Sequence, residues 1–204
     1  MNPLYVLLAI TWTAINTWLL KFPVTDHLLS EQGAFEQLQN LLNLLSMVTF
    51  TLCMLMKRED KKHLQACLLA LMSLSILLRE IEIQDFGLPA LITWLGHGTG
   101  RTLLLLMLWS IALYYARSLF STFGKTVKRA FCYPSAWFYL MGIVFLFAGM
   151  FFDKQWLTAP AGLPTVWMEE ILETNGYLLM LFSAFFFMTE QVLMERYSQR
   201  PVIA

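Results

Sequence analysis

The chain alternates between long apolar stretches and short charged segments. Stretches free of Asp, Glu, Lys and Arg cover residues 1–20, 37–56, 64–78, 102–116, 130–152 and 174–189. A helix needs about 20 mostly apolar residues to cross the hydrocarbon core of a bilayer. The pattern therefore predicts about six transmembrane helices, which we place over residues 3–21, 35–56, 64–82, 99–117, 131–152 and 170–192.

Two further uncharged segments, 86–100 and 155–168, are interrupted by glycines and by Pro89, Pro160 and Pro164. Proline and glycine disfavour a continuous membrane helix. We expect these segments to be interfacial or re-entrant. The alternative is that residues 88–96 form half of a broken helix.

Composition supports a membrane protein. Hydrophobic residues make up 58% of the chain and charged residues 14%, with a formal net charge of zero. Soluble domains average roughly 45–50% apolar and about 25% charged residues. This excludes a disordered chain, a secreted disulfide scaffold and a nucleic-acid binder that works by bulk charge. The expected fold is all-α, a polytopic membrane helical bundle formed by residues 1–204 as a single domain.

The basic residues predict the topology. With six spans, the side that holds both termini carries ten of the fourteen Lys and Arg residues. The positive-inside rule then places both termini in the cytoplasm. The first stretch lacks the basic n-region of a signal peptide, and we expect it to be a permanent helix. It also lacks the Arg- and Ser-rich character of an organelle-import leader, so we expect a multi-pass protein of a bacterial inner (plasma) membrane.

The acidic residues collect on the opposite, outer side. Ten of the fourteen lie there, which gives the outer face a charge near −6 and the inner face a charge near +6. Tryptophans are also expected at the outer interface, where an indole has an apolar body in lipid and an N–H in water. They are Trp18, Trp94, Trp156 and Trp167.

Several uncharged stretches are too short to span the membrane unaided. A helix of 15 residues, the length of 64–78 and of 102–116, reaches only about 22 Å against a core of about 30 Å. The helices must therefore extend into charged residues at their outer ends. The residues drawn in are Glu36 at the second span, Arg79 and Glu80 at the third, Arg101 at the fourth, and Glu170 and Glu173 at the sixth.

Ionisable groups at membrane depth usually face the bundle interior and pair with one another. We therefore predict one polar cluster just below the outer surface, with the two arginines as partners for the carboxylates. The alternative is that each charge reaches separately into the headgroups. The predicted members are Glu36, Asn40, Arg79, Glu80, His97, Arg101, Glu170 and Glu173.

Two features within this set suggest chemistry. His97 could join Glu80 and Glu173 in a site for a divalent cation, although the chain has no pair of histidines at metal-ligand spacing. The glycine-rich run from Gly96 to Arg101 precedes a helix, and it suits either a bound phosphate or carboxylate, or close helix packing through Gly96 and Gly100.

Three functions remain open. The first is a membrane protein with an outward-facing acidic pocket that binds a small polar ligand, or that serves as a subunit of an envelope complex. Its ligand-binding candidates are Glu36, Asn40, Arg79, Arg101 and Glu170.

The second is a hydrolase or transferase acting on a lipid headgroup. In it Glu80 or Glu173 would be the general base, and His97 a metal ligand or general acid. The third is a proton-coupled transporter, which is weaker because no charge lies in the middle of a span. The expected partners are the lipid bilayer and a membrane protein, and no nucleic acid.

Overall fold

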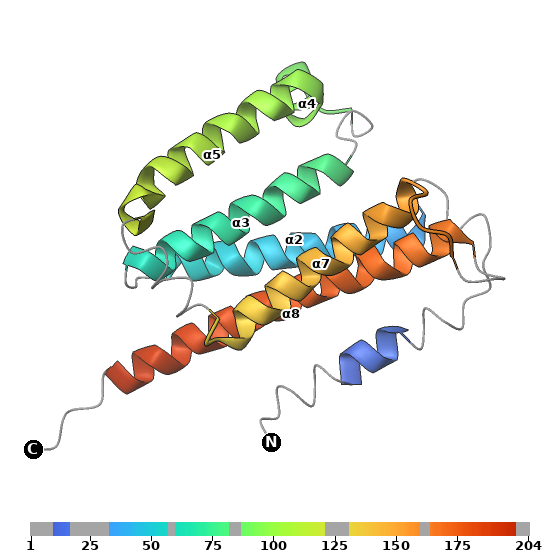
Figure 1. The fold of residues 1–204 in the computed structure, drawn as a ribbon. Coiled ribbons are helices and arrows are strands. Elements are labelled where there is room, and N and C mark those ends of the chain that lie inside the picture. The colour runs from blue at the N-terminus through green and yellow to red at the C-terminus, as the bar shows by residue number, and fades with distance from the viewer. Residues whose placement is uncertain are drawn as a thin grey trace, which may run out of the picture. The chain divides into compact units, whose positions relative to one another are not determined.

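The regular structure of the described residues is entirely helical. The structure, a computed structural model, describes residues 10–16, 33–56, 60–81, 87–120, 131–159 and 164–198. Residues 10–16 are helical. The helices labelled in Figure 1 are α2 (Ala34–Leu55), α3 (Asp60–Glu80), α4 (Ala90–Gly96), α5 (Gly98–Phe120), α7 (Pro134–Asp153) and α8 (Thr165–Ser198).

Five of the described helices are long and apolar enough to cross a membrane. The candidate spans are Ala34–Leu55, Lys62–Glu80, Gly98–Arg117, Pro134–Asp153 and Thr165–Val192. The expected fold class, a polytopic helical membrane bundle, is thus confirmed. Of the first expected span only residues 10–16 are described, so the sixth crossing stays a prediction.

The helix ends lie within the charged residues that short apolar stretches were expected to draw in. Helix α3 ends at Glu80, and α8 begins at Thr165, well before Glu170. Helix α5 begins at Gly98 and includes Arg101, whereas His97 lies just outside it. Glu80, Arg101 and Glu170 therefore belong to the helices themselves, and His97 does not.

The segment around residues 87–100 is a helix–helix corner. Helix α4 is short, and His97 after it is extended, with φ −131° and ψ 149°. Gly98 then has φ +53°, a conformation that favours glycine. A Cβ atom at Gly100 would collide with the carbonyl oxygen of Trp94. The glycine-rich run thus brings α4 close against the start of α5.

The chain divides into two compact units. The first combines Met1–Leu42 with Phe138–Phe182, and the second combines Asn43–Trp137 with Ser183–Ala204. The division falls inside α2, α7 and α8, each of which contributes residues to both units. The expectation of a single domain over residues 1–204 stays a prediction.

Helix α2 buries several polar residues and exposes many of its leucines. Gln39, Asn43 and Ser46 are at most 4% exposed. A soluble amphipathic helix has the opposite distribution, whereas a helix in lipid gains nothing by hiding leucine. The exposed large apolar residues are Leu41, Leu44, Leu45, Val48, Leu52 and Leu55, at 41% to 68%.

Helix α8 is the most buried of the candidate spans. In an 18-residue stretch of its span 72% of the residues are buried, against 17% in the matching stretch of α5. In the first unit, α7 and α8 approach at a pair of glycines: a Cβ atom on Gly142 would lie 2.8 Å from the carbonyl oxygen of Gly176. Small residues allow such backbone contact between membrane helices.

In the second unit, polar bonds attach α5 to α3. The indole of Trp109 donates to the hydroxyl of Ser75 at 3.0 Å. The guanidinium of Arg101 donates to the carbonyl oxygen of Leu78 at 2.7 Å. In the middle of α5 only Ala112 and Ala116 are buried among the described side chains, so these two bonds are directed contacts that help to fix α5 on α3.

A carboxylate of α8 caps the start of α7, also within the second unit. Glu190 accepts hydrogen bonds from the backbone N–H of Ser135 at 3.2 Å and from its hydroxyl at 2.7 Å. The hydroxyl of Ser183 donates to the carbonyl oxygen of Ser135 at 2.8 Å. A negative charge at a helix N-terminus complements the free N–H groups and the helix dipole.

Gly142→Ala should destabilise the protein by about 1–3 kcal/mol, because the added methyl group has no room between α7 and α8. Unfolding in detergent, followed by circular dichroism, measures the change. Met141→Leu is the control, since Met141 is 44% exposed on the same helix. Equal stabilities of Gly142→Ala and the wild type would contradict the tight contact.

Glu190→Gln should lower the unfolding free energy by about 1 kcal/mol, because the amide keeps an acceptor for Ser135 but loses the charge at the start of α7. Glu80→Gln is the matched control: its carboxylate pairs with Arg79, whose side chain is 67% exposed, and its loss should cost under about 0.5 kcal/mol. The same denaturation assay compares the two, and equal losses would argue against the cap.

Candidate functional site

The residues predicted to form one polar cluster are divided between the two units. Glu36, Asn40, Glu170 and Glu173 belong to the first unit. Arg79, Glu80, His97 and Arg101 belong to the second. A chamber shared by all eight stays a prediction, and the contacts of each group follow separately.

In the first unit, α2 and α8 meet through an amide and a carboxylate. The side-chain nitrogen of Gln39 donates to the Oε2 atom of Glu170 at 2.7 Å. The same nitrogen lies 3.2 Å from the hydroxyl of Thr174 and 3.4 Å from the carbonyl oxygen of Glu170. Gln39 is 4% exposed and Thr174 is fully buried. Glu170 is thus held in place from inside the helix contact.

An aromatic pair lies beside this contact. The rings of Phe35 and Trp167 meet edge to face at 5.3 Å, and both residues are 3% exposed. Ile15 and Ile171 pack against them. The expectation that Trp167 faces the headgroups is therefore wrong, because its indole fills the interior of the first unit. Trp94 and Trp156, in contrast, are more than half exposed, as an interfacial position requires.

A reciprocal amide pair joins residues 10–16 to α8. Asn16 and Asn175 each donate from Nδ2 to the other's Oδ1, at 3.0 Å in both directions. Asn175 also donates to the carbonyl oxygen of Ile171 at 2.8 Å. Side-chain amides that bond across helices stabilise membrane bundles. This pair was not predicted from the sequence.

Glu173 lies against α7. A Cβ atom at Gly149 would come within 2.8 Å of the Cγ atom of Glu173, so the absence of a side chain at Gly149 makes room for the stem of the glutamate. Glu173 itself is half-buried. Gly149 is therefore a supporting residue that the sequence reasoning missed.

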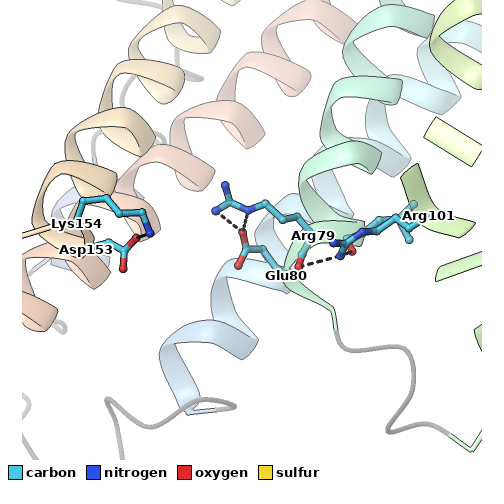
Figure 2. A network of polar contacts seen from close by, with 6 residues as sticks. Arg79, Glu80, Arg101, Asp153 and Lys154 are labelled. Carbon is cyan, nitrogen blue, oxygen red and sulfur yellow. Dashed lines mark hydrogen bonds and ion pairs between the residues drawn. The ribbon is translucent and has the colours of Figure 1, made fainter. Parts of the chain in front are cut away.

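The first unit carries an excess of negative charge. Its described residues contain five carboxylates and a single base, Lys154. That base pairs with Asp153 at 2.6 Å, as Figure 2 shows. The four remaining carboxylates are all half-buried: Glu36, Glu169, Glu170 and Glu173.

In the second unit, the two predicted arginines have different partners. Arg79 pairs with the carboxylate of Glu80 at 2.7 Å, near the surface (Figure 2). Arg101 extends from α5 to the end of α3, where it donates to the carbonyl oxygens of Leu78 and, at 3.4 Å, Arg79. A cation suits this position, because the last carbonyls of a helix carry its negative dipole end.

The predicted catalytic and metal residues are not gathered into one group by either unit. Glu80 and His97 lie in the second unit, and Glu173 lies in the first. Across the described ranges, no group of three or more His, Cys, Asp and Glu side chains could hold a metal ion. The roles of Glu80, Glu173 and His97 stay predictions, because the set draws on both units.

Comparison of the chain with protein-family models, with curated proteins and with solved structures finds no match.

The Asn16–Asn175 pair should show coupling in a double-mutant cycle. Asn16→Leu and Asn175→Leu each remove the reciprocal pair and leave the remaining amide with only its bond to a backbone carbonyl, so each should cost about 1–2 kcal/mol. The double variant should lose less than the sum by about 0.5–1.5 kcal/mol, since it leaves no unpaired amide. Detergent unfolding measures all four proteins, and additive losses would exclude the bond.

Proposed function

We propose that this multi-pass membrane protein binds a small organic cation in the first unit, where α2 meets α8. The observation that carries the proposal is the hydrogen bond from Gln39 to Glu170. The distance from Nε2 of Gln39 to Oε2 of Glu170 is 2.7 Å, and this bond positions the half-buried carboxylate. In this proposal the site opens on the outer side of a bacterial inner membrane, with both termini in the cytoplasm, as the distribution of basic residues indicates.

Charge supports a cationic ligand. Four half-buried carboxylates share the first unit with one described base, and that base already pairs with Asp153. Partial burial removes hydration from a carboxylate. A bound positive charge would offset this cost.

The available hydrogen-bonding groups favour a ligand that donates. On α2 the Oδ1 atom of Asn40 is buried and has no hydrogen-bond partner within the described part of the chain. Glu36 lies four residues before it and therefore on the same helix face. Carboxylate and amide oxygens accept hydrogen bonds, so an ammonium group fits them.

A bare metal ion is less well supported. Metal ions of the calcium and magnesium type take six or more oxygen ligands, and no three-member cluster of acidic, His or Cys side chains is found in the described ranges. An organic ammonium needs fewer protein ligands, because it brings its own directed N–H donors. A divalent cation is accordingly the alternative outcome of the test.

Glu170→Gln should weaken the binding of a diamine about tenfold, the change that corresponds to about 1.4 kcal/mol. The amide keeps an oxygen for Gln39 but removes the negative charge. The full chain in lipid nanodiscs is titrated with putrescine by calorimetry, and sodium chloride at equal ionic strength corrects for screening. Magnesium chloride is titrated in parallel.

Asp153→Asn is the matched control, since its carboxylate lies in the same unit but pairs with an exposed lysine. It should change the affinity less than twofold. The proposal fails if the wild type binds no putrescine above the salt control, or if Glu170→Gln binds as tightly as the wild type. Saturable binding of magnesium alone would replace the ammonium with a metal ion.

A further inference from the structure

Two buried polar side chains of the second unit are not accounted for by the proposed site. Asn43 on α2 and Ser73 on α3 are each 0% exposed. Neither the nitrogen nor the oxygen of the Asn43 amide has a hydrogen-bond partner among the described residues, and the same holds for the Ser73 hydroxyl. Both residues lie inside candidate membrane spans.

Other hydroxyls in these helices satisfy themselves. Thr49 donates to the carbonyl oxygen of Leu45 at 2.8 Å, and Ser75 donates to that of Leu71 at 2.7 Å. Such bonds are available to a short side chain on a helix. The Asn43 amide has two donor hydrogens and an acceptor oxygen, and neither kind of group is used.

The depth of Asn43 makes this costly. It lies nine residues after the start of α2, about 14 Å along the helix and so near the middle of a core about 30 Å thick. Lipid offers no hydrogen bonds at this depth. Buried polar groups in proteins are nearly always bonded to protein or to ordered water.

We infer that the Asn43 amide and the Ser73 hydroxyl bind ordered water inside the membrane-spanning part of the second unit. The partner must donate as well as accept, because the amide does both. A bare cation would bond the oxygen but repel the NH₂ group. The stretches of α2 and α3 that carry the two side chains are uncharged, since residues 43–55 and 64–78 contain no Asp, Glu, Lys or Arg. A neutral donor and acceptor is therefore required, and water is the smallest.

This inference does not rest on the proposed function. It concerns the other unit, a neutral ligand and residues with no part in the Gln39–Glu170 contact. Each can fail without the other.

Nuclear magnetic resonance of the side-chain amides tests the inference directly. The full chain has five asparagines, so selective ¹⁵N-asparagine labelling in perdeuterated lipid nanodiscs gives a simple spectrum. The Asn43 amide hydrogens should show a nuclear Overhauser cross-peak to water. The Asn175 amide, bonded to Asn16 and Ile171, should show none and provides the internal control.

Loss of the signal in Asn43→Leu assigns it to Asn43. If the leucine variant does not accumulate, Asn43→Ser is used in its place. An Asn43 amide without a water cross-peak would overturn the inference, and a cross-peak to lipid or to a bound solute would do so in favour of that partner. A water cross-peak that persists when Asn43 is replaced would belong to another asparagine and would also count against it.

Thermal unfolding supplies an independent readout. The double variant Asn43→Leu with Ser73→Ala removes both groups that bind the water, so its midpoint should equal or exceed that of the wild type. Asn175→Leu removes both bonds of the Asn16–Asn175 pair and should lower the midpoint by about 2–4 °C or more. An equal fall in both variants would show that Asn43 bonds to protein and would contradict bound water.

Discussion

Within a bilayer, apolar side chains gain nothing by turning toward one another, because lipid is as apolar as the protein interior. This constraint explains the arrangement of α2. Leu41, Leu44 and Leu45 are exposed on this helix, while Gln39 and Asn43 are buried. Helices must then be joined by contacts that lipid cannot replace. In this protein these are directed hydrogen bonds, such as the Asn16–Asn175 pair, and backbone contact at Gly142 and Gly176.

In the proposed function, the same bonds that join the helices would also prepare the first unit for the cation. Gln39 holds the carboxylate of Glu170 within a contact that includes a fully buried threonine. The stem of Glu173 rests over Gly149, where any side chain would displace it. Carboxylates fixed in this way would lose little entropy on binding the proposed cation, because their positions are already set.

The fold class followed from the sequence, because the length of apolar stretches is a one-dimensional property. The inclusion of Arg79, Arg101 and Glu170 in the helices also followed, from the simple fact that 15 residues are too short to cross the core. Partners were harder to predict. Arg101 bonds to backbone carbonyls, which every residue has and which no sequence pattern marks.

Uncharged partners were missed for a related reason. Gln39, Asn16 and Asn175 carry no charge, so a search for ionisable residues passed over them. The available signal was the polar spacing on α2, where Gln39 precedes Asn43 by four residues and so shares its face. Trp167 was misplaced because position near a helix end does not reveal which way an indole points. That depends on rotation about the helix axis, which packing alone determines.

The attachment of α5 to α3 has a mechanical consequence. Arg101 and Trp109 are eight residues apart on α5. Arg101 bonds to the carbonyl oxygen of Leu78 near the end of α3, and Trp109 bonds to Ser75 further inside that helix. With one such bond, a helix that faces lipid could rotate about its axis or slide along it. Two bonds at different levels restrict both the rotation and the sliding. Helix α5 can therefore keep one orientation even though only 17% of an 18-residue stretch of its span is buried.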